Sequence, residues 1–434
     1  MNRAAGYPPP RPQPFRPPAG RPLARPGRPP ASPQPRQAAA AQTIKPDRTP
    51  MRNSTVLFWW RVFVVLSCLV IAALGPLVLN ENSKVVTQVN ESAQQVLRLE
   101  AVRADVLAAD AAANNALVDA RAGQNSDADH VALLSHAAEV MTEASAAWPD
   151  DEDRLAALNT DLIGYTAVVT RGLAAQDSQE LSAASRLLDN QLLPALNEQI
   201  EINQQRLAFS IGDQRWLSVL MALPIAVLVC GSVVVARRTR RVFNIGLLIG
   251  LGLSIGVFVV TTQLVTTSAN SVGAVQTGPM VQATSASGAY AAITEAKAWE
   301  SRVLLGIATP TDGEMYFKAA VTLAEGRLGA LPDAQAAGML DQLQAFRDAH
   351  DKLLAAAGGD QTQLASARQD SNQAYQALVT WLPQQSQTIG AELNRQLIDQ
   401  ALRVRTAAGG CAGGLLLAGL AAGIGVSMPL RRYR

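Results

Sequence analysis

Four long apolar segments constrain this chain more than any other feature. They cover residues 54–79, 216–236, 242–266 and 407–430. Each has at least the ~20 residues that an α-helix needs to cross the hydrocarbon core of a bilayer. A helix satisfies its own backbone hydrogen bonds, so we interpret all four as transmembrane helices. The chain then contains two copies of one arrangement, in which a long polar segment lies between two spans.

Charge is segregated around these spans, although the net charge is only +2. Residues 1–53 hold ten Lys or Arg and one acidic residue, and 237–241 and 431–434 are also basic. The two inter-span segments, 80–215 and 267–406, hold 34 acidic and 19 basic residues. Basic loops stay on the cytoplasmic side of a membrane. We therefore predict a multi-pass plasma-membrane protein with both termini in the cytoplasm and both inter-span segments outside.

The two basic cytoplasmic regions have different predicted roles. Residues 1–53 contain 15 of the 24 prolines, a composition that cannot bury a core and favours disordered, extended chain. This tail is either a basic leader that touches anionic lipid or a docking segment for a soluble partner. The loop 237–241 is the predicted contact for a cytoplasmic partner or lipid. Its candidate residues are Arg237, Arg238, Arg240 and Arg241.

Helical periodicity dominates the first inter-span segment, 80–215. Apolar residues recur at steps of three and four from Val86 to Leu117, which predicts one long helix ending near Arg121. Turn residues at 148–151 and 176–178 separate further helices. We expect a kink at Pro194.

The second inter-span segment, 267–406, repeats this plan, with an irregularity expected at Gly278–Pro279. Leu-Leu-Pro at 192–194 corresponds to Trp-Leu-Pro at 381–383, which indicates an internal duplication. The expected fold class is an all-α membrane protein with four transmembrane helices and two extracytoplasmic four-helix bundles.

No motif for catalysis, phosphate binding or metal binding is present, so we expect neither an enzyme nor a cofactor. His130 and His136 are six residues apart, on different helix faces, and do not form a metal site. Two groups of polar residues occur on predicted helices, and a solvated face is the simpler interpretation of each, with a polar patch as the alternative. They are Asp105, Asp110, Asn114, Asn115 and Asp119, and Glu295, Lys297, Glu300 and Arg302.

The spans lack acidic residues, Lys and His, which argues against a transporter or pump. Glycines at four-residue spacing, such as Gly252 with Gly256 and Gly409 with Gly413, predict close helix packing in the membrane, unless they reflect composition alone. Each cysteine lies within a span, so no disulfide is expected in the inter-span segments. The basic tail is poor in aromatic residues, and we expect no nucleic-acid binding.

With these features placed, each inter-span segment is similar to the four-helix-bundle sensing domains of bacterial chemoreceptors and sensor kinases. Over residues 55–430 the layout resembles the GlnX-type membrane proteins of actinobacteria. That resemblance implies partnership with an extracytoplasmic amino-acid-binding lipoprotein and a cytoplasmic Ser/Thr protein kinase. Unlike in chemoreceptors, we expect no signalling coiled coil or kinase domain after the spans, which favours signalling through a separate partner.

The leading hypothesis is therefore a transmembrane signal transducer that relays extracytoplasmic amino-acid status to a cytoplasmic kinase. One alternative is a structural scaffold of the cell envelope. Another is a sensor that binds a small ligand directly in its outer bundles. Formation of a homo-oligomer is a further expectation.

Overall fold

The described residues of a computed structural model are 51–123, 129–209, 245–357 and 360–430, with single positions between 222 and 237. The chain divides into two units, Met1–Pro50 and Met51–Arg434, and the second is described here. Its described residues form helices and no strand, which confirms the all-α class. The predicted tail lies outside the described residues, except for its last three, which begin the first helix.

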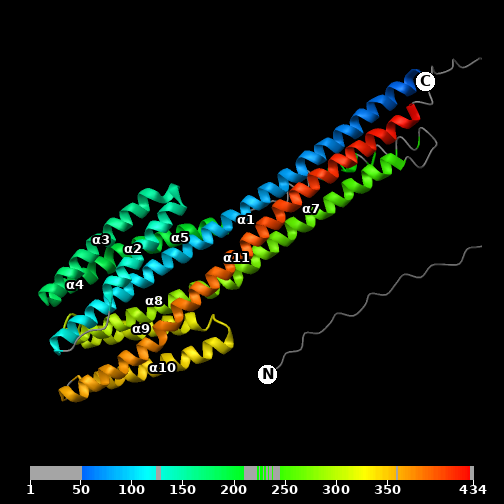
Figure 1. Ribbon diagram of the computed structural model, residues 1–434. Helices are drawn as coiled ribbons and strands as arrows, with labels where there is room; N and C mark the ends of the chain where they lie inside the picture. Colours follow the sequence, from blue (N-terminus) through cyan, green and yellow to red (C-terminus); the bar gives the residue numbers. More distant parts are fainter. Residues whose placement is uncertain are drawn as a thin grey trace, which may run out of the picture. The chain divides into compact units, whose positions relative to one another are not determined.

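The first part of this unit contains α1 and a group of shorter helices (Figure 1). These elements are α1 (Met51–Arg121), α2 (His130–Ala147), the 3-10 turn η1 (Pro149–Asp151), α3 (Glu152–Ala175), α4 (Ser178–Leu187), the π-helical turn η2 (Leu188–Leu192) and α5 (Leu193–Phe209). The second part contains α7 (Ile245–Thr277), α8 (Pro279–Leu304), α9 (Pro310–Leu328), α10 (Asp333–Ala356) and α11 (Gln361–Leu430).

Local sequence explains where these helices begin and end. The predicted end of the first helix at Arg121 is confirmed, and Gly123 behind it adopts a left-handed conformation (φ 68°) that suits glycine. Side-chain oxygens of Asp129, Asp177 and Thr309 accept backbone N–H groups at the starts of α2, α4 and α9. The predicted irregularity at Gly278 is also confirmed, because it separates α7 from α8.

One hydrophobic core runs through both inter-span segments. It includes Val96 and Leu117 of α1, Leu162 of α3, Phe317 of α9 and Leu382 of α11. The long helix α1 packs against α2 and α5 of its own segment and also against α8 and α11 of the other. Burial of a side chain of this size stabilises the fold by about 1.5–3 kcal/mol. The two segments therefore share a core instead of forming two separate bundles.

Two helical stretches are long and apolar enough to cross a membrane, Leu69–Arg121 and Leu251–Leu304, judged by length and composition in the described residues. They overlap the first and third predicted spans. The predicted span at 216–236 lies largely outside the described residues, and the span at 407–430 forms the end of α11. A four-span topology stays a prediction.

The glycine pattern in the spans shows no close packing among the described residues. A Cβ added at Gly252, Gly256, Gly409 or Gly413 would meet no atom of the described residues within 4 Å. The close approach of α1 to α11 occurs outside the predicted spans instead, at Gly390, where an added Cβ would lie 3.1 Å from Leu97 Cδ1. The described residues therefore give no support for tight packing at these four positions, and both the packing and the composition interpretations stay open.

Candidate functional site

The predicted contact residues of the basic loop cannot be examined as a group. Arg237 is described and exposed, whereas Arg238, Arg240 and Arg241 lie outside the described residues. The structure instead contains charged side chains that are buried between the two inter-span segments and within the second one. They form two groups, which we call the Arg302 cluster and the Glu300 cluster.

The Arg302 cluster joins α8 to the first inter-span segment. Its members are Asp110 and Asn114 of α1, Tyr165 of α3, Ser185 of α4, Asp189 of η2 and Arg302 of α8. The Arg302 Nη2 atom donates to Asp110 Oδ2 at 2.9 Å, and its Nη1 atom donates to Asp189 Oδ2 at 3.4 Å. Arg302 and Asp110 are 4% and 2% exposed, so this ion pair is fully inside the protein.

Three neutral groups complete the surroundings of Asp110. Tyr165 Oη donates to its Oδ1 atom at 3.2 Å, and Ser185 Oγ donates to the same atom at 2.9 Å. Asn114 Nδ2 donates to Oδ2 at 3.1 Å. A buried carboxylate needs such donors together with a countercharge, because its water shell is gone. Side chains from four elements, α1, α3, α4 and α8, therefore converge on one carboxylate.

Electrostatics fix the protonation states of the cluster. Burial would lower the pKa of Arg302, but the Asp110 and Asp189 carboxylates outweigh it and raise that pKa, so the guanidinium stays charged. Burial and the Asp110 carboxylate raise the pKa of Tyr165 well above its ordinary value. Tyr165 is therefore a permanent hydrogen-bond donor.

Asp189 reaches the cluster from an irregular turn. Pro194 has no backbone N–H and cannot donate to the carbonyl four residues earlier. The chain responds with the π-helical turn η2, in which the Leu193 N–H donates to Leu188 O. The kink expected at Pro194 thus takes the form of a π-helical turn just before it, and such turns recur at functional sites.

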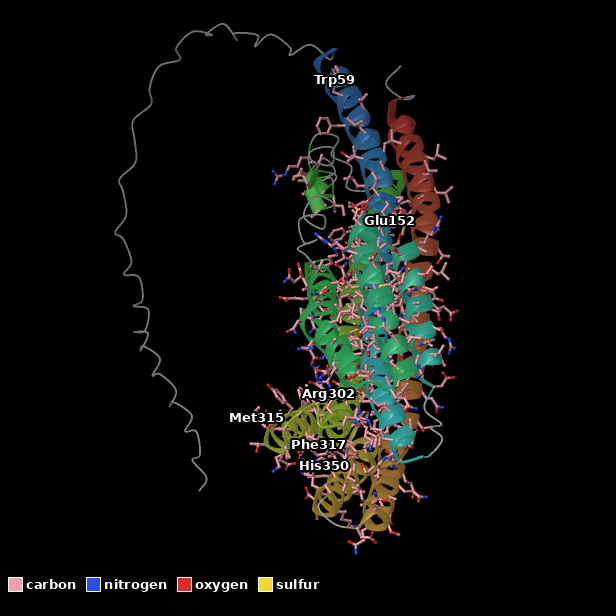
Figure 2. All side chains as sticks on the ribbon, turned by 90° about the vertical axis from the view of Figure 1, so that its left-hand side faces the viewer. Trp59, Glu152, Arg302, Met315, Phe317 and His350 are labelled. Carbon is pink, nitrogen blue, oxygen red and sulfur yellow. The ribbon has the colours of Figure 1, made fainter. Side chains whose placement is uncertain are left out.

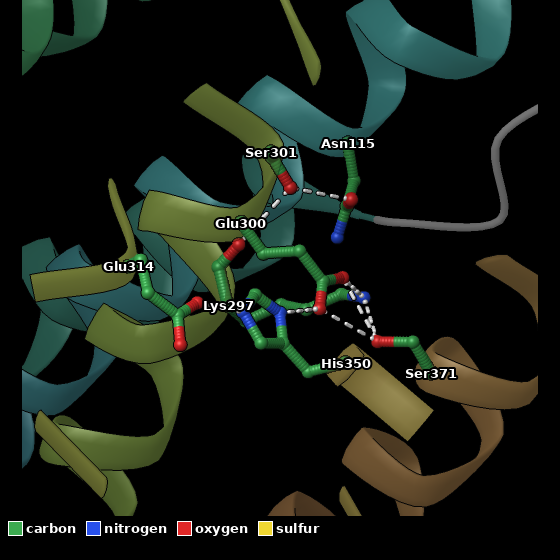
Figure 3. A network of polar contacts seen from close by, with 7 residues as sticks. All are labelled: Asn115, Lys297, Glu300, Ser301, Glu314, His350 and Ser371. Atoms are coloured by element: carbon green, nitrogen blue, oxygen red, sulfur yellow. Dashed lines mark hydrogen bonds and ion pairs between the residues drawn. The ribbon is translucent and has the colours of Figure 1, made fainter. Parts of the chain in front are cut away.

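The Glu300 cluster lies within the second segment (Figure 3). Glu300 of α8 accepts hydrogen bonds from Lys297 Nζ, from Ser371 Oγ of α11 at 2.8 Å and from His350 Nδ1 of α10 at 2.8 Å. The three ionisable side chains are at most 3% exposed. The second ring nitrogen of His350 lies 3.2 Å from Glu314 Oε2 of α9. Helices α8, α9, α10 and α11 thus meet in one charged group.

Further polar contacts join the two inter-span segments beside these clusters. Ser301 Oγ donates to Asn115 Oδ1 at 2.7 Å, and Arg368 of α11 forms an ion pair with Asp119 of α1. The interpretation of both polar groups as solvated faces is therefore wrong for their buried members. Glu295 and Lys297 also belong to α8, a helix whose small Ala, Ser and Gly residues let neighbours cover it.

The two clusters stand apart from the hollows found in the described residues. Two open hollows in the described residues measure about 300 and 310 Å³, and neither is lined by a member of the two clusters. No group of His, Cys, Asp and Glu in the described part could hold a metal ion. His136 instead makes a 2.7 Å hydrogen bond to Asp105. The two clusters consist of buried charged side chains that are joined by ion pairs and hydrogen bonds.

The sequence did not identify Tyr165, Ser185, Asp189, His350 or Ser371 as members of a site. Each is a common helical residue without a motif. The available signal was the α8 sequence, in which a run of small residues from Ala283 to Ala298 leads into Glu300 and Arg302. A helix with no wide polar face is typically buried on several sides, so its charged residues should have been expected to have partners.

The comparisons with known proteins bear on the first segment. Residues 84–211 match a family model described as "Actinobacterial sensor domain". Comparisons with curated proteins and with solved structures gave no match. The matched residues include Asp110, Tyr165 and Asp189, whereas Arg302 lies outside them. Residues 84–211 are therefore similar to an actinobacterial sensor domain, which supports a sensing role for a chain that joins this region to α8 through a buried ion pair.

Proposed function

We propose that this protein is a transmembrane signal transducer that relays extracytoplasmic amino-acid status to a cytoplasmic Ser/Thr protein kinase. The observation that carries the proposal is the continuity of α1. This helix contains the first predicted span and extends to Arg121 inside the region that matches the sensor domain. Asp110 lies 31 residues beyond Leu79, or about 45 Å along the helix axis. A displacement in the sensor region therefore has a rigid route to the membrane.

The mechanism we propose is a shift between two packing arrangements. A solute-binding lipoprotein binds the outer helices more tightly in one arrangement than in the other, and its binding changes the populations in proportion to that difference. Since α1 and α11 contact each other along their length and both include predicted spans, a small sliding or rotation of the outer helices moves the spans. Trp59 lies at the opposite end of α1 from the region of Arg302 and His350 (Figure 2).

The cytoplasmic output would use the basic regions. Residues 1–53 and the loop with Arg237, Arg238, Arg240 and Arg241 present positive charge to a kinase or to anionic lipid. Support for the lipoprotein and the kinase comes from the resemblance in layout to GlnX-type proteins. Support for sensing comes from the family-model match.

Cross-linking of the full chain in intact membranes tests this proposal. A photoreactive residue at exposed Ile163 of α3 should capture an extracytoplasmic binding protein, and one at Thr239 should capture a soluble kinase. Failure to recover either protein in membranes from cells that respond to amino acids would contradict the proposal.

The rival function is a structural scaffold, which the shared hydrophobic core favours because it makes the outer segments rigid. Deletion of residues 1–45 separates the two roles. A transducer with its output in the tail loses the kinase response while the protein remains folded in the membrane. An unchanged kinase response would assign the output to the 237–241 loop or favour the scaffold. Substitution of the four arginines of that loop by glutamine then distinguishes these two results.

A further inference from the structure

Helix α9 has an apolar face that is exposed, in addition to the one that packs inside the protein. The side chains on its buried face are those of Phe317, Ala320, Val321, Ala324 and Leu328. On the other face, Met315, Tyr316 and Leu323 are 55%, 43% and 44% exposed. A helix at the surface of a globular domain normally carries polar side chains on its outer face. The second apolar face of α9 is therefore not explained by the fold.

These three exposed side chains, which we call the α9 patch, lie far from the predicted spans. Tyr316 and Leu323 are seven residues apart, or about two helical turns, so they lie on one side of α9. Figure 2 shows Met315 projecting from the side of the protein, at the level of Arg302 and far from Trp59. An apolar surface at that distance from the spans is not covered by lipid, so it is available to another protein.

A stack of two rings and a guanidinium extends the α9 patch onto α8. The rings of Tyr316 and Trp299 have centroids 4.2 Å apart and planes 13° apart. Arg302 Cζ lies 4.6 Å from the centre of the Trp299 ring. Tyr316 and Arg302 cannot both occupy one face of that ring at these distances, so Trp299 lies between them. The partly exposed Tyr316 ring is thus held in one orientation, which lowers the entropy cost of binding to it.

Two carboxylates lie beside this stack, one from each inter-span segment. Asp189 of η2 has a side chain that is 42% exposed and lies 3.4 Å from Arg302 Nη1. Glu295 of α8 is half-buried and precedes Trp299 by four residues, so it lies next to Trp299 on the helix surface. Burial raises the pKa of both carboxyl groups, and the Asp189 charge raises the pKa of Glu295 further. An additional cation would therefore stabilise both carboxylates.

The two arginines whose charges reach these carboxylates already have closer or equal partners. Arg302 donates to Asp110 at 2.9 Å, and Arg103 lies 3.4 Å from Glu100. Over both inter-span segments, 34 acidic residues outnumber 19 basic ones. Such a surface attracts a basic partner over a long range and disfavours an acidic one.

We propose that the α9 patch, together with Asp189 and Glu295, is the binding surface for a basic region of an extracytoplasmic protein. Apolar side chains of that protein cover Met315 and Leu323. Its Arg or Lys side chains stack on the exposed ring of Tyr316 and pair with the two carboxylates. Aromatic residues, Met and Arg are the residue types enriched at the centres of protein interfaces.

This inference rests on the proposed function and deepens it, because it assigns the place where the extracytoplasmic partner binds. Asp189 belongs to the first inter-span segment and Tyr316 to the second. A partner that contacts both side chains binds most tightly to one arrangement of the two segments. Its binding therefore favours that arrangement, as a transducer requires.

Photocross-linking of the full chain in intact cells tests the surface. A photoreactive residue at position 323 should capture one extracytoplasmic protein, which mass spectrometry identifies together with the cross-linked peptide. Position 366 on α11, also exposed, is the control and should capture much less of that protein. The cross-linked region should contain Arg or Lys, and its replacement by Glu should abolish capture. Capture of a second copy of this chain, or of a region without Arg or Lys, would overturn the proposal.

Charge variants test the chemistry of the contact. In the Asp189→Asn, Glu295→Gln double variant we expect recovery of the captured protein, relative to the amount of chain in the membrane, to fall about tenfold. Tyr316→Ala should also lower it, because the ring is lost. The double variant Asp341→Asn, Asp351→Asn is the matched control, since it removes the same net charge from exposed positions of α10, and it should leave recovery unchanged. Equal recovery in both double variants would overturn the proposal.

A comparison with the cross-linker at Ile163 separates this inference from the proposed function. Capture of an amino-acid-binding protein at position 163 but of nothing at position 323 would overturn the α9 surface and leave the transducer function in place. Failure at both positions would contradict the two proposals together.

Discussion

Replacement of Arg302 by methionine tests whether the buried ion pair holds the two inter-span segments together. Methionine keeps an apolar chain similar to the aliphatic stem of arginine but removes the guanidinium charge that Asp110 faces at 2.9 Å. The variant leaves an aspartate that is 2% exposed without its countercharge. Loss of one partner from a buried pair destabilises proteins by about 3–5 kcal/mol.

The structure places the expected loss near the lower end of this range. Asp110 keeps hydrogen bonds from Tyr165, Ser185 and Asn114 after the substitution. Hydrogen bonds to a charged group contribute about 1.5–3 kcal/mol each. We therefore expect a loss of about 3 kcal/mol in the free energy of unfolding.

Equilibrium unfolding of the full chain in detergent micelles, followed by circular dichroism, measures this loss. A double-mutant cycle with Asp110→Asn isolates the ion pair, because the amide needs no countercharge. We expect the double variant to be more stable than the sum of the single losses predicts, with a coupling energy of about 1–3 kcal/mol.

Two outcomes would refute this reasoning. A loss below about 0.5 kcal/mol for Arg302→Met would be typical of a surface substitution. Additive effects in the cycle would show that Arg302 and Asp110 do not interact. Substitution of exposed Arg395, which pairs with Glu392 on α11, is the matched control and should cost less than about 1 kcal/mol.

Two further perturbations probe the second segment. The pKa of Glu300 is lowered to about 2, so its contribution to stability is present above its ordinary pKa near 4.5 and is lost as the pH falls toward 2. The Glu300→Gln variant should therefore show a weaker dependence of stability on pH in this range. An acid transition identical to that of the unmodified protein would contradict the prediction. Gly313→Ala should destabilise the protein by about 1–3 kcal/mol, because its Cβ would overlap Val303 Cγ2. Gly326→Ala on the same helix is the control: its Cβ meets open space, and the variant should be neutral or more stable by up to about 1 kcal/mol in the same unfolding assay.

Helix boundaries were predictable because single residues determine them locally. Trp148-Pro149 and Gly278-Pro279 interrupt helices through proline and glycine chemistry, and the structure has boundaries at both places. The apolar stripe of α1 was predictable for the same reason, since its period follows from one helix alone.

The packing of one segment against the other was not predictable from these patterns. Asp110 and Arg302 are 192 residues apart in sequence, and neither local pattern shows that another helix covers it. A periodic stripe identifies the most apolar face of α1 but not a second, polar face that α8 buries. The Glu300 cluster escaped prediction likewise, because its members come from four helices that only the tertiary fold brings together.

The most direct test of the transducer account is the side of the membrane on which the first inter-span segment and the 237–241 loop lie. In a chain whose three cysteines are replaced by alanine, single cysteines at Ser135 and Thr239 are exposed in intact cells to a maleimide that cannot cross membranes. Ser135 is exposed at the surface of α2. The account predicts labelling at position 135 in intact cells and at position 239 only after the membrane is opened. Labelling of position 239 in intact cells, or protection of position 135, would contradict it.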